Sequence, residues 1–227
     1  MRILGIETSS RRGSVALVED GQLVAACSHE HPNAHAERLL PMLEELLSDA
    51  GWDRGSLDRV GVGVGPGSFT GLRVGIALAQ GIAMGLAIPV VGVGSLRCMA
   101  RAVHPDLAGL RWAMLDARRS ELFCAVYDQG GTEVVRPITL PRDTALARLA
   151  ELCPAGPHIV VGEVASEVGA NGVKRSEKTD LPHAHWAAVL AGETVGDEAD
   201  VEPAYVREPD AVLPNLPPHP LAKERES

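Results

Sequence analysis

The sequence predicts an α/β protein made of two related βββαβα units, of which the second is shorter and degenerate. Segments rich in β-branched residues alternate with segments of helical periodicity over residues 2–161. The 227 residues are long enough for one or two compact domains. The second half also begins like the first at an offset of 109 positions, as three pairs show: Arg2 and Arg111, Glu7 and Asp116, Gly21 and Gly130.

The first unit is expected to open with three strands, because residues 2–8, 14–19 and 22–28 are apolar and β-branched, and Asp20-Gly21 is a tight-hairpin signal. Leucines at helical spacing predict a helix over residues 35–50, which Pro41 either begins or kinks. The remaining expected elements are a strand at 60–64, a helix at 70–86, a strand at 88–93 and a helix at 95–103.

The second unit repeats this order more briefly. Its expected strands cover residues 112–116, 121–128, 132–140 and 158–161, with a helix over 142–152. We therefore place a first subdomain at residues 1–105, a second at 106–208 and a mobile tail, rich in proline and charge, at 209–227.

The most specific segment is the glycine-rich run from Val60 to Gly75. Its valines share one face of a strand, and the glycines between them leave the other face bare, so a second backbone or a ligand can approach closely. Ser68 or Thr70 is then placed to cap a helix whose free amides favour an anion or a partner's acceptor. The run matches neither a Walker A loop nor a dinucleotide fingerprint. A corner that only packs is the alternative.

Composition restricts the function classes. The net charge of −9 argues against direct binding of a nucleic-acid backbone, so a role on RNA requires a partner. The four cysteines form no Cys-x-x-Cys pair and no signal peptide is recognisable, which predicts free thiols and a cytoplasmic protein. The longest apolar run is shorter than the roughly 18 to 20 residues that a bilayer requires, so no membrane span is expected.

Three places are candidate nucleotide or anion contacts: the end of the first strand in each unit and the start of the helix at 70–86. Duplicated folds of this kind hold phosphate at such places. The hairpin after the first strand lacks the Asp and Gly of catalytic members of such folds. A plain turn is therefore the favoured interpretation, and a weak or vestigial nucleotide contact is the alternative. The candidate residues are Glu7, Thr8, Ser9, Gly67, Ser68 and Asp116.

Other reactive side chains indicate no catalytic residue and no metal site. Within the histidine cluster at 29, 31 and 35, the last two have an i,i+4 spacing that can chelate zinc on a helix. An intervening proline argues against one helical face, so a solvated loop followed by a helix start is the interpretation. The nucleophile elbow Gly-x-Ser-x-Gly is absent. The arginine pairs at 11–12 and 118–119 are interpreted as solvated surface, with binding of acidic groups as the alternative.

Five segments carry a family resemblance, and Gly-Pro-Gly-Ser-Phe-Thr-Gly at 65–71 is the most specific part of them. They are residues 2–9, 35–43, 65–75, 116–118 and 202–207. Along essentially its whole length the chain resembles the bacterial TsaB family of tRNA threonylcarbamoyladenosine biosynthesis proteins. The resemblance implies the actin, heat-shock chaperone and sugar kinase (ASKHA) superfamily, and a non-catalytic relative of the transferase TsaD.

In that relative a His-x-x-x-His pair binds metal, and the resemblance places Ser95 and Met99 at those positions. A hydroxyl and a thioether do not replace two imidazoles. The resemblance thus implies an accessory subunit of a threonylcarbamoyl transferase complex rather than an enzyme. It implies no cofactor on this chain, because ATP or ADP and metal belong to the partner subunits.

The implied partners are TsaD, as a heterodimer, and the ATPase TsaE, with self-association when TsaD is absent and tRNA contact only through the complex. The partner surface is implied on the two long helices of the first subdomain, where small residues permit close approach. That both helices only cover their own sheet is the alternative. The expected interface is His35, Leu39, Met42, Leu43, Leu46, Gly71, Arg73, Gly75, Ala79 and Ala83.

Two further function classes stay open. An ATP-dependent kinase or phosphatase of the same superfamily would depend on Glu7 and Asp116 for magnesium-dependent hydrolysis. A metalloprotease or metal-dependent transferase would carry stoichiometric metal, although the sequence has no matching site.

Overall fold

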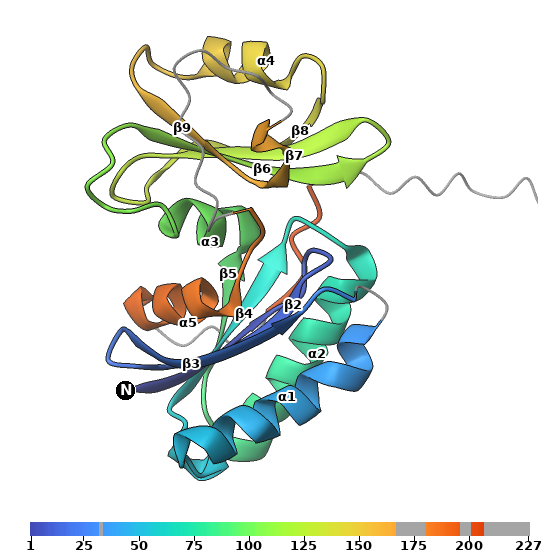
Figure 1. Cartoon of the computed structure of the whole chain (residues 1–227), viewed down its shortest axis with the longest axis vertical. Coiled ribbons are helices and arrows are strands. Elements are labelled where there is room, and N and C mark those ends of the chain that lie inside the picture. Colours follow the sequence, from blue (N-terminus) through green and yellow to red (C-terminus); the bar gives the residue numbers. More distant parts are fainter. Residues whose placement is uncertain (32–33, 167–179, 196–200, 207–227) are drawn as a thin grey trace, which may run out of the picture.

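The computed structural model describes residues 1–31, 34–166, 180–195 and 201–206, which form two sheets one above the other along the long axis of the molecule (Figure 1). The first sheet has the strand order β3-β2-β1-β4-β5, and the second has the order β8-β7-β6-β9. In each, the first strand is antiparallel to its hairpin partner and parallel to the strand that follows a helix. The predicted duplicated α/β order is confirmed. The tail predicted at 209–227 lies outside the described residues.

The first sheet carries a core on both of its faces. Along its central strand, Leu4 and Ile6 belong to one apolar cluster, while Ile3 points to the other face and belongs to a second cluster. The predicted turn at Asp20 and Gly21 forms with φ angles of 50° and 81°. The strands are β1 (Arg2–Glu7), β2 (Gly13–Glu19), β3 (Gln22–His29), β4 (Arg59–Gly65) and β5 (Val90–Gly94).

Two helices, α1 (His35–Ala50) and α2 (Phe69–Leu86), cover one face of this sheet (Figure 1). Pro41 lies inside α1 and does not begin it. Gly51 ends α1 at a φ of 66°, which glycine adopts without steric cost. The hydroxyl of Ser68 caps α2 by accepting a hydrogen bond from the Gly71 amide at 3.3 Å, as one of the two predicted caps.

The bare glycine face of β4 is covered by α5 (Ala184–Glu193), on the side opposite α1 and α2 (Figure 1). A Cβ at Gly61 would overlap the carbonyl oxygen of Ala187, so the helix backbone lies directly on the strand. Arg59 fixes the far end of α5 by donating from Nη1 to the carbonyls of Ala191 and Thr194, both at 2.9 Å. The predicted close approach of a second backbone is therefore confirmed.

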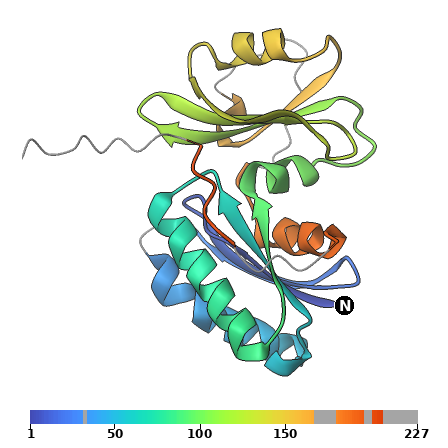
Figure 2. The same cartoon turned by 180° about the vertical axis from the view of Figure 1, so that it is seen from behind.

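Each predicted subdomain, residues 1–105 and residues 106–208, contains a helix that packs on the sheet of the other, and the predicted division did not include this. Helix α3 (Ser95–Arg101), from the first range, packs on the second sheet, whereas α5, from the second range, packs on the first. Segment 201–206 also returns to the first unit, where the Ala204 amide donates to the Val64 carbonyl at 2.7 Å (Figure 2). The physical reason is the bare face of β4, which needs a close cover that the first range does not supply.

The second sheet lies between α3 on one face and α4 (Ala145–Leu152) on the other. Helix α4 starts three residues later than the predicted 142, because residues 142–144 form a turn. Short 3-10 turns occur at Arg54–Ser56 (η2) and Glu163–Ser166 (η3). The strands are β6 (Leu110–Arg118), β7 (Glu121–Tyr127), β8 (Glu133–Pro141) and β9 (His158–Val161).

Within the described ranges, α2 is the one helix long and apolar enough to cross a bilayer by length and composition. It packs on β4 and beside α1, and its Leu72 and Ile76 are buried in the first core cluster. This is the arrangement of a helix in a globular domain.

Two glycines of α2 allow a test of the packing. A Cβ at Gly71 would overlap the Thr8 carbonyl oxygen, whereas a Cβ at Gly81 meets nothing within 4 Å. We expect Gly71→Ala to lower the free energy of unfolding by about 1–3 kcal/mol, because backbone must move. We expect Gly81→Ala to raise it by about 0.5–1 kcal/mol, because the unfolded chain loses freedom. Urea unfolding measures both, and effects of the same sign would contradict this packing.

Candidate functional site

Glu7, at the carboxyl end of β1, is fully buried and bound by neighbouring parts of the chain. Its Oε1 accepts a hydrogen bond from the Ser9 amide at 2.7 Å, and its Oε2 accepts one from the Ser95 hydroxyl at 3.0 Å. Gly63 leaves the necessary room, because a Cβ there would overlap the carboxylate. Burial raises the pKa of Glu7, and the hydrogen bonds from Ser9 and Ser95 oppose that rise. The carboxyl group joins strand, loop and helix instead of facing a ligand.

Ser95 and Met99 hold structural positions in α3. The Ser95 hydroxyl accepts from the Gly65 amide at 3.2 Å while it donates to Glu7. Met99 is buried in the apolar cluster under the second sheet. In the described part of the chain, no group of three or more His, Cys, Asp or Glu residues is placed to hold a metal ion. That the chain binds no metal stays a prediction.

The loop between β1 and β2 fills the predicted anion site at the start of α2. The Ser68 amide donates to the Ser9 carbonyl at 2.7 Å, and the Thr8 hydroxyl donates to the Gly71 carbonyl at 2.8 Å. A Cβ at Gly67 would also overlap the Ser9 carbonyl oxygen. A phosphate bound at a helix N-terminus needs free backbone amides there, and the Ser68 amide is already taken by Ser9. The residues present therefore do not fit a nucleotide phosphate here.

The geometry agrees with the plain turn, and a nucleotide contact of these residues stays an untested prediction. The structure brings together Glu7, Thr8, Ser9, Gly67 and Ser68, but these residues bind one another. Asp116 lies elsewhere, exposed at the end of β6, where its Oδ1 accepts from the Arg118 amide at 2.9 Å and from Arg142 Nη2 at 3.0 Å. Its role is to hold the β6–β7 hairpin, in which Arg118, Arg119 and Ser120 all have positive φ.

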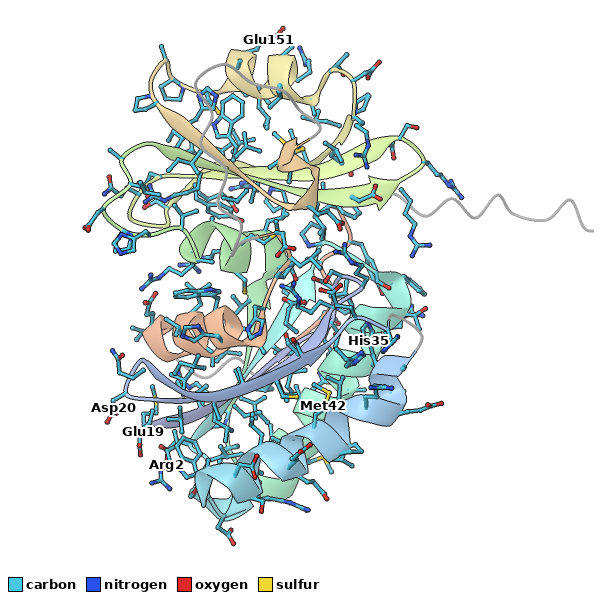
Figure 3. All side chains as sticks on the ribbon, in the orientation of Figure 1. Arg2, Glu19, Asp20, His35, Met42 and Glu151 are labelled. Carbon is cyan, nitrogen blue, oxygen red and sulfur yellow. The ribbon has the colours of Figure 1, made fainter. Side chains whose placement is uncertain are left out.

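The expected partner interface stays an untested prediction, although most of its residues face the chain's own interior. A Cβ at Gly75 would overlap the Thr8 hydroxyl, so the small-residue seam serves packing on β1. Of the ten expected residues, only Arg73 is exposed and Met42 half-buried; Figure 3 shows Met42 and His35 on α1. The buried ones are His35, Leu39, Leu43, Leu46, Gly71, Gly75, Ala79 and Ala83.

The outward face of α2 has an unusual composition for a surface helix. Met84 is 88% exposed, and a Cβ at Gly81 or Gly85 would meet nothing within 4 Å. Such faces normally carry many charged side chains, but Arg73 is the one charged residue in α2. We call the following exposed residues the outward face of α2: Thr70, Arg73, Ala77, Gln80, Gly81, Met84 and Gly85.

His29 and His35 form a buried pair, so these side chains are not solvated as expected, whereas the expected helix start is confirmed because His35 begins α1. His35 Nδ1 lies 3.4 Å from His29 Nε2, and His35 Nε2 lies 3.2 Å from the Ser10 carbonyl oxygen. Gly13 provides their space, because a Cβ there would contact both rings. Burial lowers the pKa of both imidazoles, and the neighbouring His35 lowers that of His29 further.

The arginine pair at 11–12 is also not simply solvated. Arg11 forms an ion pair with Glu163 of η3, and Arg12 Nη2 lies 3.1 Å from Glu30 and 3.5 Å from Asp180. These contacts hold the β1–β2 loop against parts of the chain that follow β9. Residues 163 and 180 were not expected near this loop from their position in the sequence.

One cluster was not predicted at all. The Arg73 guanidinium lies 3.6 Å from the centroid of the Phe69 ring, and the Tyr205 ring is 5.6 Å from the same ring. Both aromatic side chains are more than half exposed, at 53% and 55%. The available signal was an aromatic residue at a helix start in a chain with 3% aromatic residues.

Comparison with known proteins gives a consistent result. Residues 29–187 match the family model "TsaD: tRNA N6-adenosine threonylcarbamoyltransferase". The tRNA threonylcarbamoyladenosine biosynthesis protein TsaB of Escherichia coli K12 is 34% identical over 91% of this chain and 95% of its own length. The solved structure of YeaZ from Pseudomonas aeruginosa covers 90% of this chain and 99% of its own, with a TM-score of 0.77 and 30% identity.

A more distant likeness shows the fold alone. The ROK hexokinase of Thermus thermophilus matches 85% of this chain and 98% of its own with a TM-score of 0.51, at 14% identity. This likeness and the two-sheet architecture agree with the expected ASKHA-type fold.

The buried imidazoles predict a loss of stability in acid. Because their pKa is lowered in the folded state, the unfolded chain takes up protons first as the pH falls below about 6.5, by up to about 1.4 kcal/mol per pH unit for each proton. The free energy of unfolding should therefore fall between pH 7.5 and 5.5. His183, whose pKa burial lowers to about 4, adds in the same direction. Glu7, with its raised pKa, acts in the opposite direction.

A comparison of variants isolates the contribution of the pair. The double variant His29→Gln, His35→Gln should show a shallower dependence of unfolding free energy on pH than the parent, measured by urea unfolding at each pH. His104→Gln, which removes an exposed imidazole, is the control. An unchanged slope in the double variant would rule out the pair as the source.

Proposed function

The chain belongs to the TsaB family of tRNA threonylcarbamoyladenosine biosynthesis proteins, and we propose that it is a non-catalytic subunit that binds TsaD and supports threonylcarbamoyl transfer to tRNA, together with the ATPase TsaE. The observation that carries this proposal is the match to TsaB over nearly the full length of both chains. The chain acts in the cytoplasm and contacts tRNA only through the complex. It self-associates when TsaD is absent.

Two features support a role without chemistry of its own. The buried carboxylate of Glu7 and the amide of Ser68 are both taken by hydrogen bonds from or to the β1–β2 loop. The positions that the resemblance equates with metal-binding histidines hold Ser95, whose hydroxyl bonds Glu7, and Met99, in the apolar core. ATP or ADP and metal are therefore assigned to the partner subunits, and a kinase or phosphatase role is disfavoured.

The partner surface is best assigned to the outward face of α2 and the adjoining part of α1. Its small residues are open, so a partner helix can approach closely without displacing core side chains. Leu40 of α1 and Met84 of α2 add exposed apolar area, at 45% and 88% exposure. This replaces the buried seam of the same helix as the site of contact.

A charge on this face should weaken the complex. We expect Met84→Asp to reduce affinity for purified TsaD by about tenfold or more, roughly 1.4 kcal/mol, because a carboxylate must be desolvated among small apolar residues. Isothermal titration measures affinity, and mass spectrometry of tRNA measures modification in the reconstituted system. Leu152→Asp, on the half-exposed Leu152 of α4, is the matched control. Equal effects of both variants would contradict the assignment.

The non-catalytic role has a separate test. The isolated chain should not hydrolyse ATP in the presence of magnesium above the blank rate. Hydrolysis that depends on Asp116, shown by its loss in Asp116→Asn, would support a kinase or phosphatase and refute the accessory role.

A further inference from the structure

The aromatic cluster at the start of α2 goes beyond the proposed surface. We propose that Phe69, Arg73 and Tyr205 form an anchor for the protein partner, which supplies a carboxylate to Arg73 and an apolar side chain to the two rings. This inference rests on the proposed function, because it names the chemistry that the partner of the outward face of α2 must carry.

The exposure of the two rings is the first step. Phe69 and Tyr205 are 53% and 55% exposed, although the chain has apolar cores on both sheets in which aromatic rings are normally buried. Exposed aromatic residues beside an arginine have the composition of energetic centres in protein interfaces. The cluster also adjoins the outward face of α2, since Arg73 belongs to both.

Tyr205 is held in place by its own segment. Val201 is buried in the first core cluster, and its carbonyl accepts from Gln80 Nε2 at 3.0 Å. The Ala204 amide donates to the carbonyl of Val64 at 2.7 Å. The segment thus runs past the start of α2 and sets the Tyr205 ring 5.6 Å from that of Phe69 (Figure 2). An anchor fixed before binding loses little side-chain entropy on binding.

Arg73 supplies the charge preference. Several arginines of this chain pair with its own acids, for example Arg2 with Glu19 and Arg54 with Glu44. Arg73 has no acidic partner among the described residues, although the chain carries a net charge of −9. A guanidinium lying over a ring still presents its N–H groups at its edge, where a carboxylate binds in a bidentate manner. An acidic side chain of the partner is the complementary group.

A protein fits this surface better than a nucleic acid. Neighbouring α1 exposes four acidic residues, Glu37, Glu44, Glu45 and Asp49, and one basic residue, Arg38, so its net negative charge disfavours a polyanionic phosphate backbone. The guanidinium of Arg73 also occupies one face of the Phe69 ring that a base would need for stacking. The remaining free surface is apolar with one positive charge, which suits an apolar and an acidic side chain on one protein segment.

Binding of purified TsaD to full-length variants tests the anchor, by titration calorimetry in low and high salt. We expect Arg73→Gln to weaken binding about tenfold or more in low salt and to remove most of the salt dependence. Tyr205→Ala should weaken binding in both salts, and Tyr205→Phe should restore most of the affinity. Arg136→Gln, on a side chain that is 88% exposed in the second unit, should have no effect. Thermal unfolding checks that each variant is folded.

The outcomes separate the two proposals. If Met84→Asp weakens the complex while Arg73→Gln and Tyr205→Ala bind like the parent, the outward face is right and the anchor is wrong. Unchanged affinity with lost tRNA modification would overturn the anchor in favour of an RNA contact. If the parent chain does not bind TsaD, the proposed function fails and the anchor falls with it.

Discussion

The structure depends on close backbone contact at the glycine-rich corner of β4 and α2. Because glycine has no side chain, the α5 backbone can lie against Gly61 and the Glu7 carboxylate against Gly63. The β1–β2 loop lies against Gly67 and Gly71 for the same reason. Segments that are distant in the sequence meet there, because a Cβ at any of these positions would overlap them. The corner therefore fixes how the first strand, the second helix and the late helix α5 fit together.

The same contact occupies polar groups at the end of β1 and at the start of α2. In a phosphate-binding corner the amides at the helix start remain free, whereas here the Ser9 carbonyl takes the Ser68 amide. Glu7 is likewise used by Ser9 and Ser95, in surroundings that raise its pKa. In a fold shared with a hexokinase, Glu7 and the Ser68 amide are thus bound by the chain itself, and the exposed surface of α2 is where we propose that the partner binds.

One side of α2 packs in the core, and the other side is the proposed partner surface. Its inward small residues bring the helix onto β1, where Gly75 faces the Thr8 hydroxyl. On its outward side, a Cβ at Gly81 or Gly85 would meet nothing within 4 Å among the described residues, and the exposed rings of Phe69 and Tyr205 lie at one end of that face. One helix therefore contributes to the core and to the proposed partner surface, because a helix presents both sides every four residues.

The sequence by itself determined the strands, the helices and their duplicated order, because side-chain periodicity and turn residues such as Asp20-Gly21 act locally. It also determined that the glycine face of β4 must be approached closely. Tertiary structure decided what approaches: the α5 backbone at Gly61 and the Glu7 carboxylate at Gly63. It also decided that Gly71 and Gly75 face inward, and that Tyr205 meets Phe69 and Arg11 meets Glu163. These outcomes depend on contacts between residues far apart in the chain, and a local pattern of small or charged residues does not specify which neighbour fills the space it leaves.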